Sequence, residues 1–151
     1  MLTLSKKTDY ALIALGYLAA EAGRIAPARE IAAAYNMPCA LLMNLLKDLQ
    51  QNHIVRSLRG TKGGYQLAGD PHRISLYDVI RITDGDLHTT ECSCETEIPC
   101  SCRVSHNCPI QSPLKAFHHK MIRFLKDVKL SDLILAGHRI DVPLELVGVT
   151  N

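Results

Sequence analysis

Five of the chain's six cysteines lie within a segment of seventeen residues, and this segment constrains the fold most strongly. The spacing is C-x-C-x5-C-x-C-x5-C, formed by Cys92, Cys94, Cys100, Cys102 and Cys108. Most residues between them are polar, with acids, serines, a proline and a histidine among them, and only Ile98 and Val104 are aliphatic. A cysteine in a core has apolar neighbours at helical or strand spacing. The segment therefore predicts a loop outside the core, on which the thiolates can converge on one soft metal centre.

Two explanations of these thiols are open. Closely spaced thiolates can hold zinc or an iron–sulfur cluster, or they can form disulfides. The chain shows no signal peptide, which predicts a reducing cytoplasm, where such cysteine patterns are typically metal-binding or catalytic. The sequence thus favours a metal or cluster loop in a cytoplasmic protein, with structural disulfides as the alternative.

Length and charge narrow the function further. A chain of 151 residues can form one domain with a real core, and no apolar run is long enough to cross a bilayer. The net charge is only +2, but bases outnumber acids from Lys47 to Arg73, and every charged residue from Asp84 to Glu97 is an acid. A basic segment followed by an acidic, cysteine-rich one indicates two functions along one chain. The scarcity of aromatic residues argues against base-stacking surfaces for single-stranded nucleic acid.

Hydrophobic spacing predicts three helices in the first third of the chain. They run from Lys6 to Ala22, with Ser5 as N-cap, from Ala28 to Tyr35, and from Pro38 to Gln51. The third helix has leucines at steps of three and four residues on its inner face, which leaves a polar and small-residue outer face of Ala40, Met43, Asn44, Lys47 and Asp48. Two short helices joined by a tight turn in this way predict a helix-turn-helix.

A basic hairpin is predicted directly after the third helix. A strand from His53 to Leu58 leads into the glycine-rich tip Arg59–Gly64, and a return strand runs from Tyr65 to Ala68. Glycines allow such a tip to approach another backbone, and its basic side chains suit phosphates or a groove. A helix-turn-helix followed by a basic hairpin is typical of a winged helix that reads double-stranded DNA. The fold class expected is therefore mainly α with a small β-wing.

The predicted DNA contacts come from the third helix and the wing. They are Pro38, Cys39, Ala40, Met43, Asn44, Lys47, Arg59, Thr61, Lys62 and Gly63. Cys39 is expected to be a small packing residue or a DNA-facing thiol. Because Asn44 is the main hydrogen-bonding group of a largely apolar face, the sequence leaves the base preference unreadable.

The second half of the chain predicts a short helix, from its cap Ser75 to Thr83, and a long amphipathic helix after Pro109. So long an apolar stripe needs a second surface to bury against, and the same helix of a two-fold-related partner subunit is the simplest such surface. We expect a last short helix capped by Ser131, and solvated or interface positions for His118 and His119.

The chain is predicted to divide into a winged helix over 1–83, a cysteine loop over 84–108, a dimerisation helix and short C-terminal helix over 109–136, and a flexible tail over 137–151. A homodimer is expected to form through residues 109–128.

Together these segments resemble a known family. The chain is similar to the bacterial winged-helix regulators that hold iron–sulfur clusters, the family that includes IscR, NsrR and RirA. The matching segments are Leu4–Leu12, the wing Arg59–Ala68, Ile74–Ile80, the pair Glu91–Cys92 and Val128–Leu133. They span residues 1 to about 135, and the order of wing and cysteine loop is specific.

The resemblance implies a homodimeric transcription regulator that binds a roughly palindromic operator. A two-iron or four-iron cluster would control operator binding in response to nitric oxide, redox state or iron supply. The family has three cysteines with five residues between each, but no three cysteines of this chain keep both gaps. Cys92 and Cys108 align best with the outer positions, and the middle ligand is Cys100 or Cys102.

The family's fourth ligand is not a cysteine. In some members it is an aspartate from the first helix of the other subunit, and Asp9 stands at that position here. Asp9 has an alternative role as a first-turn acid that complements the helix dipole. His106, within the cysteine loop, is the rival ligand.

Two other functions remain open from the sequence. The first is a DNA-binding regulator that uses zinc or a thiol–disulfide switch in place of a cluster. The second is an iron–sulfur electron carrier or enzyme, but no substrate motif, nucleotide loop or acid–base set accompanies the cysteines. We therefore expect no enzymatic activity.

Overall fold

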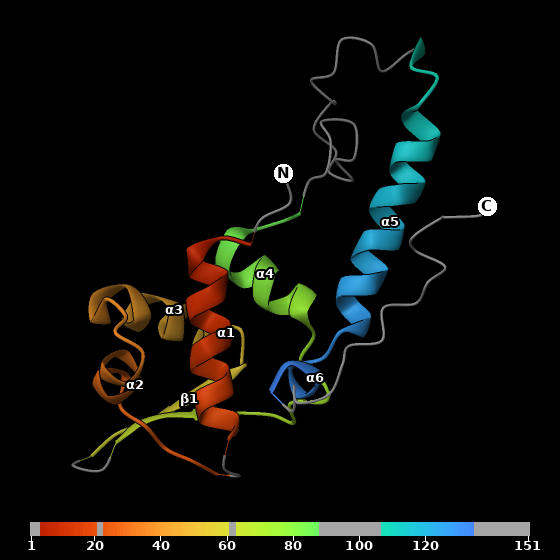
Figure 1. Cartoon of the computed structure of the whole chain (residues 1–151). Coiled ribbons are helices and arrows are strands. Elements are labelled where there is room, and N and C mark those ends of the chain that lie inside the picture. The colour runs from red at the N-terminus through yellow and green to blue at the C-terminus, as the bar shows by residue number, and fades with distance from the viewer. Residues whose placement is uncertain (1–3, 21–22, 61–62, 88–106, 135–151) are drawn as a thin grey trace.

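The computed structural model describes residues 4–20, 23–60, 63–87 and 107–134 (Figure 1). Helices dominate these residues, and two short strands form one antiparallel hairpin. The elements in order are α1 (Lys6–Ala19), α2 (Ala28–Ala34), α3 (Cys39–Gln51), β1 (Val55–Leu58), β2 (Gly64–Leu67), α4 (Leu76–Asp84), α5 (Gln111–Asp127) and α6 (Leu130–Ile134). The predicted fold class, mainly α with a small β-wing, is confirmed.

Helix α1 lies at the centre of the N-terminal half (Figure 1). Its buried side chains, which include Leu15 and Leu18, pack in one core with leucines of α3, and Val79 of α4 and Leu130 of α6 join the same core. The predicted inner face of α3 is buried at Leu42, Leu45, Leu46 and Leu49. Spacing at three and four residues thus placed this helix correctly against α1.

Several predicted ends differ from the observed ones. Helix α1 ends at Ala19, short of the predicted Ala22. Strand β1 begins at Val55 because His53 adopts a left-handed backbone (φ 59°) in the turn that ends α3. Ser131 does not cap α6: it is buried inside that helix, and the Asp132 carboxylate accepts a hydrogen bond from the Lys129 amide (2.9 Å).

Helix α5 projects away from α1–α3 (Figure 1). Its C-terminal end is attached by a β-bridge between Ser75 and Lys129, in which the Leu76 amide donates to the Val128 carbonyl (2.9 Å). Within the described residues, no helix combines the length and the apolar character needed to cross a membrane.

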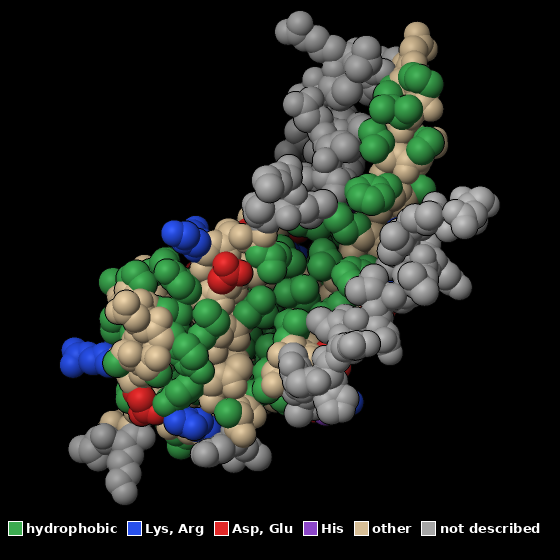
Figure 2. Space-filling model, viewed as in Figure 1, with side chains coloured by type: hydrophobic (Ala, Val, Ile, Leu, Met, Phe, Trp, Pro, Cys, Tyr) green, Lys and Arg blue, Asp and Glu red, His purple; other side chains and the backbone are tan. Residues whose placement is uncertain are grey.

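The apolar stripe of α5 is covered on one side and open on the other. His118 is buried, on the same side of the helix as the half-buried Leu114 and Met121, so its solvated alternative is wrong and its interface alternative stays a prediction. Phe117 and Ile110 are 51% and 56% exposed, and Figure 2 shows hydrophobic side chains along the projecting part of α5. The open side of α5 is therefore available to a second surface.

Candidate functional site

The outer face of α3 carries the predicted contacts as exposed side chains. Ala40, Asn44 and Lys47 are exposed, and Met43 is 50% exposed. The Asn44 amide makes no hydrogen bond with any described residue. Cys39, at the first position of α3, is half-buried and packs against the core, which agrees with the packing role proposed for it. This face can therefore meet a groove without first rearranging.

The turn between α2 and α3 holds the two helices at a fixed angle. Asn36 adopts a left-handed backbone (φ 51°), a conformation that asparagine tolerates better than most residues. The Met37 amide then donates to the Ala32 carbonyl (2.9 Å), and the Met37 side chain is buried. Backbone geometry and one buried side chain thus set how α3 leaves α2.

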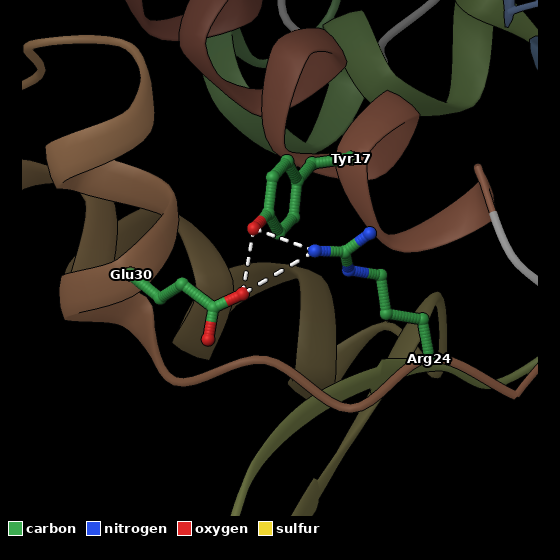
Figure 3. Close-up of polar contacts among 3 residues, drawn as sticks. All are labelled: Tyr17, Arg24 and Glu30. Atoms are coloured by element: carbon green, nitrogen blue, oxygen red, sulfur yellow. Dashed lines mark hydrogen bonds and ion pairs between the residues drawn. The ribbon is translucent and has the colours of Figure 1, made fainter.

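A polar cluster ties α2 to the end of α1. The Tyr17 hydroxyl donates to the Glu30 carboxylate (2.6 Å), and Arg24 Nη2 donates to the Tyr17 hydroxyl (2.7 Å) (Figure 3). The Arg24 guanidinium also lies over the Tyr17 ring, 4.1 Å from its centroid. Tyr35, at the end of α2, meets the same ring edge-on. The cluster orients the helix-turn-helix relative to α1.

The hydrogen bonds of this cluster shift two pKa values in opposite directions. The bond from Tyr17 lowers the pKa of Glu30 below its ordinary value of 4.5. The bond to Glu30, with some desolvation, raises the pKa of Tyr17 above 10.0. At neutral pH the pair is therefore held as a carboxylate and a neutral phenol.

The wing is fastened to the loop before α2. Strand β1 pairs with β2 from Val55↔Leu67 to Leu58↔Gly64, and Ala26 extends the ladder through two backbone hydrogen bonds with Tyr65 (2.8 and 3.0 Å). A Cβ at Gly64 would lie 2.5 Å from backbone atoms of Ala26. A glycine is therefore required here for the close approach of two backbones.

The hairpin reaches the side of the molecule on which α2 and α3 lie (Figure 1). Arg59 is exposed at the end of β1, and Gly63 is half-buried, while Thr61 and Lys62 lie outside the described residues. Buried Gln66 accepts from Arg56 (2.9 Å) and donates to the Gly23 carbonyl (2.6 Å), which braces the base of the hairpin.

Of the predicted metal ligands, the structure describes two. Cys108 is half-buried just before α5, and Asp9 is exposed in the first turn of α1. Cys92, Cys94, Cys100, Cys102 and His106 lie outside the described residues. Among the residues that are described, no three metal-binding side chains come together, and Cys39 and Cys108 are not in disulfides.

A group of hydrogen-bonded side chains that the sequence did not predict joins α4 to α1. Asp84, the last residue of α4, accepts hydrogen bonds from the hydroxyls of Ser5 (2.6 Å) and Thr8 (2.8 Å). The hydroxyls of Thr8 and Thr83 lie 2.6 Å apart, and both residues are buried. The end of α4 is thus held against the first turn of α1, which carries Asp9. Thr8 and Thr83 stand at helix positions where apolar residues are otherwise found, and this was the signal in the sequence that could have predicted the contact.

Comparison with known proteins identifies the family. The family model Rrf2, described as an iron-dependent transcriptional regulator, matches residues 4–136. The chain is 37% identical to the HTH-type transcriptional regulator NsrR of Bacillus subtilis over 90 residues, which cover 59% of this chain and 62% of that protein.

Solved structures show the same fold. CymR, the global cysteine regulator of B. subtilis, superposes with a TM-score of 0.68 at 26% identity, and 89% of this chain and 98% of CymR are covered. IscR of T. potens has a TM-score of 0.67 at 23% identity, with 93% and 92% covered. This chain is a member of the Rrf2 family of bacterial winged-helix transcriptional regulators.

Proposed function

We propose that this protein is a homodimeric regulator that binds a roughly palindromic DNA operator, and that an iron–sulfur cluster on its cysteine segment controls this binding. The observation that carries the DNA-binding part is the exposed outer face of α3 beside a basic hairpin. In a winged helix, the second helix of the helix-turn-helix enters the major groove. The wing side chains Arg59 and Lys62 would contact phosphates or the adjacent groove.

The open side of α5 supports the homodimer. Phe117 and Ile110 expose more than half of their surface, and apolar side chains at this spacing on a long helix suit a second copy of the same helix. A dimer would present two copies of α3, as a palindromic operator requires.

The donor set of the cysteine segment fits an iron–sulfur cluster. Cysteine thiolates are the usual ligands of such clusters, and five fall within 92–108. Cys108 would be one outer ligand and Cys92 the other, with Cys100 or Cys102 between them. Asp9 or His106 would supply the fourth. When bound, the cluster would supply a centre that reacts with nitric oxide or oxidants.

A second candidate function is a thiol-based or zinc-structured switch. The similarity to CymR, the global cysteine regulator of B. subtilis, is the observation that supports this alternative. The chain has two cysteines more than the family pattern, and its two C-x-C pairs would serve such a switch through zinc chelation or disulfide formation. In either case the chain regulates transcription.

Absorbance of the protein purified without oxygen, read with its iron, sulfide and zinc content, tests the cofactor. Sulfide-to-iron charge-transfer bands with stoichiometric iron are expected. Colourless protein that holds zinc, or that holds no metal after reconstitution, would refute the cluster and favour the zinc or thiol switch.

A double variant tests the wing. Arg59→Ala with Lys62→Ala removes two cations from each protomer and four from the proposed dimer, so the slope of log affinity against log salt should fall by about four. Unchanged affinity and salt slope would show that these side chains do not contact DNA.

A further inference from the structure

The exposed face of α3 carries little hydrogen-bonding chemistry. Along the helix its exposed side chains are Ala40, Met43, Asn44, Lys47 and Asp48, with Gln51 at the last residue, two turns beyond Asn44. No arginine occurs between Pro38 and Gln51, so this helix lacks the side chain that most often recognises guanine in the major groove. The face therefore has to recognise bases by other means.

We infer that α3 selects A·T pairs, with Asn44 contacting an adenine and with Ala40 and Met43 contacting thymine methyl groups. An asparagine side chain can pair with N6 and N7 of adenine through both its oxygen and its nitrogen, and this pattern is unique to adenine in the major groove. Because the Asn44 amide is exposed and makes no hydrogen bond with the described residues, both groups are available. This inference rests on the proposed DNA-binding function and specifies its ligand.

The two apolar residues match a methyl group better than any polar base edge. Thymine is the one base with a methyl group in the major groove, and a polar edge facing Met43 or Ala40 would lose its water without gaining a hydrogen bond. Met43 is long, flexible and half exposed, so it can lie across a methyl group. Ala40 is short enough to let the first turn of α3 come close to the bases.

Helix geometry places these contacts on neighbouring base pairs. Ala40 and Asn44 are four residues apart, which is about 6 Å along the helix axis. Base pairs are stacked about 3.4 Å apart, so the stripe spans two or three of them. Lys47 lies one turn further from the helix start, where its ammonium suits a phosphate. Each half-site should then contain a short run of A·T pairs with the thymine methyl groups facing α3.

The first experiment is selection of bound sequences from random DNA by the full-length protein. Consecutive A·T pairs are expected in each half-site. G·C pairs at the positions that α3 faces would overturn the inference and leave the proposed function intact. Failure to enrich any sequence would overturn the proposed function as well.

Replacing selected thymines by deoxyuridine removes the methyl group and nothing else. Wild-type protein should lose affinity several-fold at one or two positions per half-site, and Met43→Ala should lose that discrimination. Equal binding of the thymine and deoxyuridine sites by wild-type protein would refute the methyl contacts.

Asn44→Ala tests the adenine contact. A bidentate asparagine–adenine pair discriminates by about 5- to 150-fold, so this preference should disappear at one position of each half-site. Lys47→Ala serves as the contrast, because loss of a phosphate contact weakens binding to all sequences alike. If Asn44→Ala also weakened all sequences alike, Asn44 would not read a base.

Discussion

The winged-helix half and helix α5 bury their apolar side chains to very different extents. In α1, Leu15 and Leu18 are 0% and 1% exposed, and they are covered by elements of the same chain. In α5, whose seventeen residues are all described, the buried residue is His118, while Phe117 stays half exposed. The first region completes its own core, whereas the second has an apolar side that this chain leaves uncovered. The proposed dimer would cover that side with a second copy of α5.

The largest effect is expected in the core. Leu15→Ala should lower the free energy of unfolding by about 3 kcal/mol, because it leaves a cavity among fully buried side chains. Chemical unfolding at one fixed protein concentration measures this, since the proposed dimerisation would also add stability. Ile13→Ala on the same helix, where the side chain is 36% exposed, should cost less than half as much. Equal losses of unfolding free energy in the two variants would contradict the burial of Leu15 in a core that this half of the chain completes by itself.

A charge on the open side of α5 tests the other region. Phe117→Glu should raise the dissociation constant of the dimer about 100-fold, because a carboxylate would replace an aromatic anchor. Analytical ultracentrifugation measures the constant. Leu58→Glu, at another exposed apolar residue, is the matched control and should leave it unchanged. A dimer that tolerates Phe117→Glu would place the interface elsewhere.

The wing should be destabilised by a side chain at the position where its backbone lies against that of Ala26. Gly64→Ala forces a Cβ to within 2.5 Å of the Ala26 backbone and should destabilise the protein by about 2 kcal/mol. The same change at Gly69, where a Cβ would meet no atom within 4 Å, is the control and should cost much less. Thermal unfolding compares the two variants, and similar melting temperatures would contradict the close approach.

The smallest effect concerns pH. Because the pKa of Glu30 is lowered in the folded protein, its contribution to stability is full above pH 4.5 and is lost as the pH falls below that value. The raised pKa of Tyr17 acts in the opposite sense: its contribution is full below pH 10.0 and is lost at higher pH.

Unfolding of wild type and Glu30→Gln at pH 7 and pH 3 measures the acid side. The difference between the two proteins should shrink at pH 3. A difference that is independent of pH would mean that the Tyr17–Glu30 hydrogen bond does not depend on the carboxylate charge.

The two regions also differ in how well their sequences predict them. The helices and the hairpin of the winged half were found to within three residues, because leucine spacing, Ser5 and Ser75 are local signals. The interior of the cysteine segment lies outside the described residues, so its ligand set stays a prediction. The solvated alternative for His118 was wrong, because it followed from the usual exposure of histidine and not from the position of His118 on the helix.

The sequence by itself determined the order of the functional parts: a helix-turn-helix, a wing, a cysteine segment and a long amphipathic helix. Each is encoded by residues that are close together in the chain. Only the tertiary structure decided that Asp84 meets Ser5 and Thr8, that Gly64 lies against Ala26, and which side of α5 is covered. These contacts join residues as many as 79 positions apart, and the spacing of neighbouring residues carries no information about such partners.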